Sequence, residues 1–299
     1  MMIGRYIRQF FMKPYELYKA KDIDTTPVNT VGLIVGPYRN LTTLTGSVLM
    51  LHPNCQVLNH AGMRILNWKC LNFMRNPTRE TWERFIRYAI YISGRGQRGD
   101  YGGSVTFSHA FQHEDILGKY EDRYGDKLIK NKINSVIWKE SLRISKYIKN
   151  HNIKIETLID EFSGLRFIQP IRNPLDCARS NIKTNMTDRF EELGKKASMQ
   201  ETLSEILLEY KWFLDKKQKE QDRFFYFMEY DFNQQMLENL VKFLELEPEK
   251  QWIDDVLEIY EQKSTYQHSK QEINYFKREV KNIFEEYPGF VEEMLNFVN

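Results

Sequence analysis

Short apolar runs alternate with amphipathic stretches along the 299-residue chain. The apolar runs are bounded by turn signals, which predicts buried strands. These predicted strands cover residues 31–35, 56–58, 133–138, 165–169 and 224–228. The stretches between them carry apolar residues at helical spacing, most clearly in residues 77–93. Helices are predicted over residues 42–51, 77–93, 139–150, 203–214, 233–246, 250–262 and 271–287.

Strands separated by helices predict an α/β fold, with a central parallel sheet of about five strands flanked by helices. No internal repeat or linker interrupts the pattern, so residues 1–299 are interpreted as a single domain. Residues 1–25 are expected to hold an N-terminal helix, either packed on the domain or lying against a membrane surface as a peripheral contact. Residues 93–104, rich in Gly and Arg, are expected to form a mobile loop.

Composition narrows the function classes. The net charge is only +2, with 28% charged and 14% aromatic residues, so neither disorder nor a generally basic nucleic-acid-binding protein is favoured. Three cysteines without CxxC spacing argue against a disulfide framework and a zinc ribbon, and predict a reducing, cytoplasmic location. The charges are segregated, however: residues 64–98 hold eight Lys/Arg and two acidic residues, and residues 234–262 hold two Lys and eight acidic residues. The basic segment is therefore a candidate anion-receiving region.

The loop after the first predicted strand reads GPYRNL and leads into a helix that begins with Thr42 and Thr43. A helix N-terminus presents unpaired N–H groups and a partial positive charge, which suit a phosphate or sulfate group. Arg39 adds a planar cation that can donate several hydrogen bonds. No Gly-Lys-Thr/Ser follows Gly36, so the loop is not the phosphate-binding motif of ATP- and GTP-hydrolysing enzymes. An ordinary strand–helix turn capped by Thr42 is the competing interpretation.

A second signal lies in LRFIQPIRNPLDCARS, residues 165–180. A strand ends, Arg172 follows in a turn, and Pro174 starts a helix that carries Ser180. Because a loop residue and a helical residue can converge on one ligand, Arg172 and Ser180 predict a second anion contact.

These two segments resemble motifs of the sulfotransferases that use 3′-phosphoadenosine 5′-phosphosulfate (PAPS). The family's phosphosulfate loop, G-x-P-[RK]-S-G-T-[TS], is matched at Gly36, Arg39, Thr42 and Thr43. The family's 3′-phosphate motif, R-[ND]-P-x-D-x-x-x-S, is matched throughout residues 172–180. The resemblance implies a P-loop NTPase-like sulfotransferase fold and transfer of a sulfuryl group from PAPS, without a metal, to a hydroxyl or amine.

The resemblance also implies roles for individual residues. Arg39, Thr42 and Thr43, with backbone N–H groups of Asn40 and Leu41, would hold the 5′-phosphosulfate. Arg172 and Ser180 would hold the 3′-phosphate, and Lys139, at the end of the third predicted strand, would assist the leaving group.

Asn40 and Leu41 replace the Ser-Gly pair of the family. Leu41 is therefore expected either to adopt a helix-like conformation or to distort the loop. Asn40 can still donate a hydrogen bond. The alternative that follows is a nucleotide-binding protein of the same fold that has lost its transfer activity.

His60 is the candidate base, because histidine takes up protons near neutral pH and His60 falls where tyrosylprotein sulfotransferases carry a catalytic Glu after their His-Pro. His109 and His113 are its rivals. The acceptor is expected to be a carbohydrate, a lipid or a small metabolite rather than a nucleic acid, and to bind through helices and loops of residues 60–130 and 180–200. Basic residues that could contribute to the site are Arg95, Arg98, Lys119, Lys270, Lys277 and Arg278.

Overall fold

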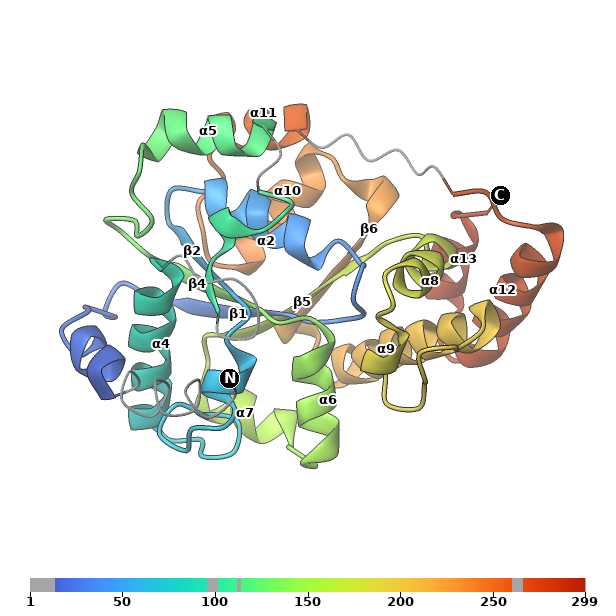
Figure 1. Ribbon diagram of the computed structural model, residues 1–299, viewed down its shortest axis with the longest axis horizontal. Helices are drawn as coiled ribbons and strands as arrows, with labels where there is room; N and C mark the ends of the chain where they lie inside the picture. The colour runs from blue at the N-terminus through green and yellow to red at the C-terminus, as the bar shows by residue number, and fades with distance from the viewer. Residues whose placement is uncertain (1–13, 96–101, 112–113, 260–265, 299) are drawn as a thin grey trace, which may run out of the picture.

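A computed structural model describes residues 14–95, 102–111, 114–259 and 266–298 (Figure 1). Its centre is a six-stranded sheet of order β3-β2-β4-β1-β5-β6. Its strands are β1 (Thr30–Ile34), β2 (Cys55–Asn59), β3 (Gly103–Ser104), β4 (Ser135–Lys139), β5 (Leu165–Ile171) and β6 (Phe224–Met228). All pair in parallel except β3, which is antiparallel to β2. The predicted parallel sheet is confirmed, and β3 adds a strand inside the segment predicted as a loop.

Successive side chains of β1 point to opposite faces of the sheet, and the apolar core is correspondingly divided between the two faces. Val31 and Leu33 of β1 pack into one apolar cluster, whereas Ile34 packs into another. The first face is covered by α4 (Arg79–Ser93), α6 (Leu142–Asn150), α7 (Ile155–Glu161) and part of α9 (Met199–Lys219). The second face is covered by α2 (Thr42–Leu51), α5 (Glu114–Tyr124), α10 (Gln234–Phe243) and α11 (Lys250–Ile259). Figure 1 shows these helices on opposite sides of the sheet.

A third apolar cluster lies beyond β5 and β6. It joins α8 (Pro174–Lys183) and α9 to α12 (Lys270–Ile283) and α13 (Pro288–Leu295). The predicted helix 271–287 was wrong in extent, because the chain turns before Pro288 and begins a second helix there. The short α3 (Gly62–Ile65) follows β2.

The predictions for the N-terminal helix and for the loop over residues 93–104 concern segments that lie partly outside the described residues. Residues 14–20 are helical, as expected, but residues 1–13 are not described. The loop predicted over residues 93–104 is described only at its ends, where Ser93 belongs to α4 and Gly103–Ser104 forms β3. Over the described ranges, no helix combines the length and the apolar character needed to cross a bilayer.

A buried lysine holds the far end of α2. The Lys130 ammonium group donates hydrogen bonds to the carbonyl oxygens of Met50, His52 (2.7 Å) and Cys55 (2.6 Å). These include carbonyls at the C-terminal end of α2, which a helix leaves without partners. Lys130 therefore connects the C-terminal end of α2 to the start of β2. The opposite end of α2 begins with Thr42 and Thr43, which belong to the predicted anion-binding segment.

Replacing Lys130 with methionine is expected to lower the free energy of unfolding by about 3 kcal/mol, because buried carbonyls lose their donors. Urea denaturation of Lys130→Met and of the control Lys132→Met, at an exposed position, measures the effect. The control is expected to change stability by less than about 0.5 kcal/mol. Equal midpoints for the two variants would contradict this role of Lys130.

Candidate functional site

The loop between β1 and α2 has a backbone that few residue types adopt. Gly36 has φ 104°, and a Cβ there would lie 3.2 Å from Gln169 and 3.3 Å from Asn40. Arg39 and Leu41 have φ 63° and 60°, both in the left-handed region. Leu41 is therefore not helix-like in the right-handed sense: it takes a conformation that glycine adopts without strain. At Leu41 the loop therefore has the left-handed backbone conformation that is usual for glycine.

Asn40 holds this loop against the end of β5. Its buried amide donates to the Pro170 carbonyl and accepts from the Arg172 N–H (2.9 Å) and the Tyr210 hydroxyl (2.8 Å). The hydrogen bond that the sequence expected Asn40 to donate thus goes to the protein itself. Asn40 couples the two predicted anion-binding segments and leaves ligand contacts to its backbone N–H.

Helix α8 holds the loop from a second side. The Asn181 amide donates to the Tyr38 carbonyl (2.7 Å), and the Cys177 thiol lies 3.3 Å from the same oxygen. The Arg39 Nε donates to the Ser180 hydroxyl at 3.0 Å, although 141 residues separate the two. The structure therefore brings together Arg39 and Ser180, which the sequence analysis had assigned to two different phosphate contacts.

Arg172 lies among acidic and aromatic groups. Its Nη2 is 3.6 Å from Asp176 Oδ2 and its Nε is 3.9 Å from Glu229 Oε1, while its guanidinium lies 5.8 Å from the centre of the Tyr266 ring. Neither carboxylate is within hydrogen-bonding distance, and the buried Nε has no hydrogen-bond partner in the described part of the chain. Burial raises the pKa of Glu229. Arg172 can therefore take an anion without breaking a hydrogen bond of its Nε.

The segment before α12 approaches the same place. His268 Nε2 lies 2.7 Å from the buried carboxylate of Asp176. The basic residues expected here are placed differently: Lys270 is exposed and Arg278 lies beside Glu279 and the Tyr275 ring. His268 and Tyr266, rather than Lys270 and Arg278, are thus the C-terminal neighbours of the Arg172 cluster. The sequence carried no motif that marked them.

The N-terminus of α2 faces the end of β4. The Thr42 hydroxyl is 2.7 Å from the hydroxyl of Ser141, which follows β4. Ser141 has φ 59° and donates its N–H to the Ile34 carbonyl at the end of β1. Thr42 and Thr43 occupy the first turn of α2, where backbone N–H groups point out of the helix. This end of the sheet therefore gathers the hydroxyl and N–H donors expected of an anion site.

Lys139, the last residue of β4, is 3% exposed. Its side-chain carbons pass 3.6 Å from the position of a Cβ on Gly46 of α2, which directs the chain beneath the first turns of that helix. The pKa of Lys139 is lowered to about 8, mainly by burial; the Glu140 carboxylate opposes this shift, and the charges of Arg143 and Arg39 add to it. Its ammonium nitrogen has no hydrogen bond or ion pair with the described residues. An anion at the α2 N-terminus would supply the missing partner.

His60 follows β2 on the other side of β4. Its N–H donates to the Lys139 carbonyl (2.8 Å), and its own carbonyl accepts from the Trp138 indole (2.6 Å). Its Nδ1 lies 3.9 Å from Glu140 Oε1, and the side chain is 29% exposed. The candidate base is therefore fixed next to the candidate catalytic lysine through their backbones.

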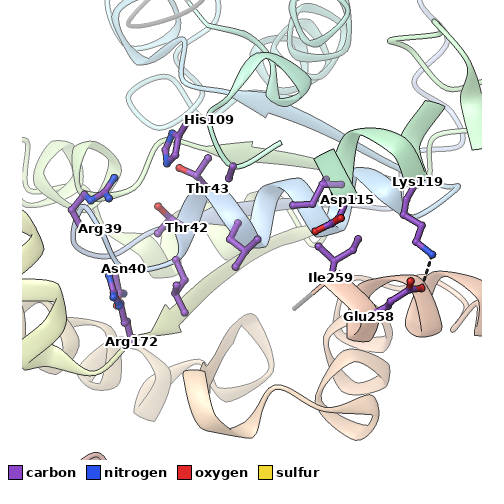
Figure 2. A pocket seen from close by; sticks show the side chains of 14 residues that line it. Arg39, Asn40, Thr42, Thr43, His109, Asp115, Lys119, Arg172, Glu258 and Ile259 are labelled. Carbon is purple, nitrogen blue, oxygen red and sulfur yellow. Dashed lines mark hydrogen bonds and ion pairs between the residues drawn. The ribbon is translucent and has the colours of Figure 1, made fainter. Parts of the chain in front are cut away.

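A cavity of about 830 Å³ opens over the α2 N-terminus. Figure 2 shows Arg39, Thr43 and His109 at one end of it, and Asp115 and Lys119 towards the other. Its lining comprises Arg39, Asn40, Leu41, Thr42, Thr43, Leu44, His109, Ala110, Asp115, Ile116, Lys119, Arg172, Glu258 and Ile259.

Six of the predicted site residues therefore share this cavity, whereas Gly36, His60, Lys139 and Ser180 lie outside its lining. Of the two rival bases, His109 lines the cavity, and His113 falls outside the described residues.

The basic segment 64–98 does not form the anion-receiving region that its charge suggested. None of the described residues of this segment lines the cavity, and three of its arginines, Arg79, Arg84 and Arg87, pair with Glu80 and Glu83 along α4. Arg95 lies over the Tyr91 ring, and Arg98 is not described. Lys119 does line the cavity, but it pairs with Asp255 (3.2 Å) and Glu258 (2.6 Å) of the acidic segment. Net charge along the sequence was thus a poor guide to charge around the site.

No family model matches the chain, and no curated protein matches it. Several solved structures do. A sulfotransferase from Alicyclobacillus acidocaldarius is 11% identical, covering 87% of this chain and 95% of its own, with a TM-score of 0.39. A sulfotransferase from Mycobacterium avium is 13% identical, covering 95% and 80%, with a TM-score of 0.44. A mouse sulfotransferase complexed with PAP is 9% identical, covering 94% of each chain, with a TM-score of 0.43. Each of the three is described as a sulfotransferase.

The left-handed backbone at Leu41 leads to a test of the loop. Leu41→Gly is expected to keep the free energy of unfolding within about 1 kcal/mol of the wild type, because glycine adopts this conformation freely. Leu41→Val is expected to lower it by about 2 kcal/mol, since β-branched residues are strongly disfavoured at positive φ. Thermal and urea unfolding of both variants measure the difference. Equal destabilisation by glycine and valine would show that side-chain packing, not backbone conformation, governs this position.

Proposed function

We propose that this protein transfers a sulfuryl group from PAPS to a hydroxyl or amine of a carbohydrate, lipid or small metabolite. The observation that carries the proposal is the joining of two anion-binding segments in one cavity. The α2 N-terminus with Arg39 forms one of them, and Arg172 forms the other. A donor with phosphate groups at two positions of its ribose would engage both segments, whereas a 5′-nucleotide would engage one.

The rest of the cavity suits the remainder of such a donor. Leu44, Ile116 and Ile259 supply apolar side chains between the charged groups. A flat purine base packs well against aliphatic surfaces while its edges face polar groups. The lining thus has the mixed character that a nucleotide requires, with Arg39 and Arg172 at one end and Lys119, which pairs with Asp255 and Glu258, towards the other.

The residues around the α2 N-terminus would supply most of the catalysis. When bound, PAPS supplies the activated sulfuryl group. Thr42, Thr43 and the adjoining N–H groups would orient the sulfate and phosphate oxygens, and Arg39 would neutralise part of their charge. Lys139 would stabilise negative charge that develops on the leaving phosphate. Positioning and electrostatic stabilisation of this kind dominate catalysis of phosphoryl transfer, which sulfuryl transfer resembles.

The acceptor must lose a proton as it attacks, and two histidines are candidates to receive it. His60 lies beside the buried carboxylate of Glu140, whereas His109 lines the cavity above Thr43 (Figure 2). We place the base at His60, because its Nδ1 faces the buried Glu140 carboxylate, which can orient the imidazole. Variants His60→Gln and His109→Gln separate the two: the base variant is expected to lose turnover by about 100-fold or more, with unchanged donor affinity.

The second candidate is a protein that binds the nucleotide without transferring sulfate. The use of the Asn40 side chain inside the protein favours it, because that side chain is then unavailable to a sulfate group. The buried Lys139 favours transfer instead, because a lysine at the end of β4 can stabilise the negative charge that develops on the leaving phosphate. Both candidates predict binding of the product nucleotide, and they differ only in turnover.

Calorimetry with adenosine 3′,5′-bisphosphate tests the donor site first. Binding with a dissociation constant of about 100 μM or lower is expected, and no binding at this concentration would refute both candidates. A screen of sugars, lipids and phenols with ³⁵S-labelled PAPS then tests transfer. Labelled product supports the enzyme, whereas binding without product from any acceptor class supports the binding protein.

A further inference from the structure

We propose that Glu140 is a positioning residue for His60, holding the imidazole by its Nδ1–H so that Nε2 is free to receive a proton. The inference rests on the proposed function, in which His60 is the base. Glu140 was no part of the expected site, because the resemblance pointed to its neighbour Lys139. Its place between β4 and α6 brings its carboxylate next to a histidine that comes 80 residues earlier in the chain.

The carboxylate of Glu140 is buried, with 1% of the residue exposed. Its Oε2 accepts the Gly62 N–H at 2.9 Å, and its Oε1 accepts an Arg143 N–H at 2.7 Å. The same Oε1 lies 3.9 Å from His60 Nδ1. A buried carboxylate that keeps its charge needs such donors. A small rotation of the imidazole would complete a third hydrogen bond, and contacts of this type commonly shorten when a substrate is bound.

The backbone at His60 is held in a rare conformation. His60 and Ala61 have φ 63° and 79°, two consecutive non-glycine residues in the left-handed region. Hydrogen bonds to Lys139 and Trp138 fix His60, and the Gly62 N–H is fixed by Glu140 itself. Strain of this kind persists only where the surroundings over-determine it, and it is common at functional sites. Here it turns His60 out of the strand and towards Glu140.

Two glycines make room for this arrangement. A Cβ on Gly62 would lie 2.7 Å from Arg143 Cδ and 2.9 Å from Glu140 Cδ, so any side chain there would displace both. A Cβ on Gly102, whose φ is 78°, would lie 2.3 Å from the Ala61 Cβ. The cluster of His60, Glu140 and Arg143 is thus built into the ends of β2 and β4, and is not a chance approach of surface side chains.

Other histidines show what sets His60 apart. His52 is buried, and both ring nitrogens face backbone groups, Glu247 O at 3.0 Å and Asn54 N at 3.2 Å. His268 also meets a carboxylate, but its second ring nitrogen, Nδ1, is buried. His60 has one nitrogen facing a carboxylate and a side chain that is 29% exposed. It can therefore be oriented by Glu140 while part of the ring stays exposed.

The proton follows a simple path in this arrangement. The acceptor hydroxyl gives its proton to His60 Nε2 as its oxygen forms the new bond to sulfur, while the bond between sulfur and the 5′-phosphate oxygen of the donor breaks and adenosine 3′,5′-bisphosphate leaves. The Nδ1 proton stays where it is, facing Glu140, whose negative charge stabilises the imidazolium. Nε2 later gives its proton to water. Glu140 neither touches the substrate nor takes up a proton.

The tautomer of His60 tests the proposal without donor or acceptor. Long-range ¹H–¹⁵N spectra of ¹⁵N-histidine-labelled protein distinguish Nδ1–H from Nε2–H at about pH 8.5, where imidazoles are mostly neutral. The His60→Gln spectrum assigns the signal. We expect the Nδ1–H tautomer in the wild type and a shift towards Nε2–H in Glu140→Gln. Glu83→Gln, the same change on α4, is the control and is expected to leave His60 unaltered.

Reaction with diethyl pyrocarbonate gives a second readout. Carbethoxylation of His60, followed by peptide mass spectrometry, is expected to slow by about threefold or more in Glu140→Gln, because Nε2 becomes less nucleophilic. Exposed His151 serves as the internal control and is expected to react at the same rate in both proteins.

A wild-type His60 in the Nε2–H form would overturn the proposal even if Glu140→Gln failed to fold. An unchanged tautomer in a folded Glu140→Gln variant would also overturn it. Both results are independent of bisphosphate binding, so they leave the proposed function standing, and absence of bisphosphate binding leaves the tautomer result standing.

Discussion

Replacing Arg172 with alanine is expected to weaken binding of adenosine 3′,5′-bisphosphate by about 100-fold, the usual cost of removing one partner from a buried charged hydrogen bond. The guanidinium has a buried Nε without a hydrogen-bond partner among the described residues, so a phosphate would gain contacts there at little cost. Its loss would also leave Asp176 and Glu229 facing the anion. Titration calorimetry of wild type and variant measures the change.

Adenosine 5′-monophosphate is the matched ligand control, because it lacks the 3′-phosphate. Its affinity is expected to be the same for wild type and Arg172→Ala. Arg84→Ala, an exposed arginine of α4, is the matched protein control and is expected to bind both ligands normally. An equal loss for both nucleotides would contradict the assignment. It would mean that Arg172 acts through the loop, whose Asn40 holds its backbone N–H.

Replacing Lys139 with methionine is expected to reduce turnover by about 100-fold, since one donor to developing charge is lost. The same variant is also expected to change the number of protons that the protein takes up when it binds adenosine 3′,5′-bisphosphate. The pKa of Lys139 is lowered to about 8 by burial, so near pH 8 part of the free protein carries a neutral amine. A bound phosphate favours the ammonium form, and binding is then expected to take up roughly half a proton.

Calorimetry in buffers of different ionisation enthalpy measures this uptake. It is expected to disappear in Lys139→Met and to persist in Lys242→Met, at an exposed position. Identical proton uptake in the wild type and Lys139→Met would show that Lys139 does not meet the phosphate.

The lowered pKa of Lys139 also determines how the free energy of unfolding changes with pH. The folded pKa of Lys139 lies below its ordinary value of 10.5, so between about pH 8 and 10.5 the unfolded chain binds the extra proton. Lys139 therefore makes folding more favourable as the pH rises through this window, and less favourable as it falls. The dependence is expected to flatten in Lys139→Met.

The sequence alone predicted the parallel sheet, and it placed the two candidate anion-binding segments at the ends of predicted strands, because both depend on local pattern. An apolar run of five residues followed by glycine favours a buried strand with a tight turn after it, because such a run is shorter than most helices. Arg172 and Ser180 were found in the same way, since a turn, a proline and a helix follow one another within nine residues. Local order of this kind survives in the fold unchanged.

The tertiary structure decided what lies across from these segments. The Arg39–Ser180 hydrogen bond, the Thr42–Ser141 contact and the His60–Glu140 approach each join residues from separate elements. Parallel strands bring their C-terminal ends to one edge, but register and strand order decide which side chains meet there. The same holds for charge: the arginines of α4 pair with glutamates one turn away, whereas Arg172 lies 3.6 Å from Asp176 and 3.9 Å from Glu229, beyond hydrogen-bonding distance, and Lys139 is buried. Sequence determined which groups the chain carries, and burial decided which of them can act.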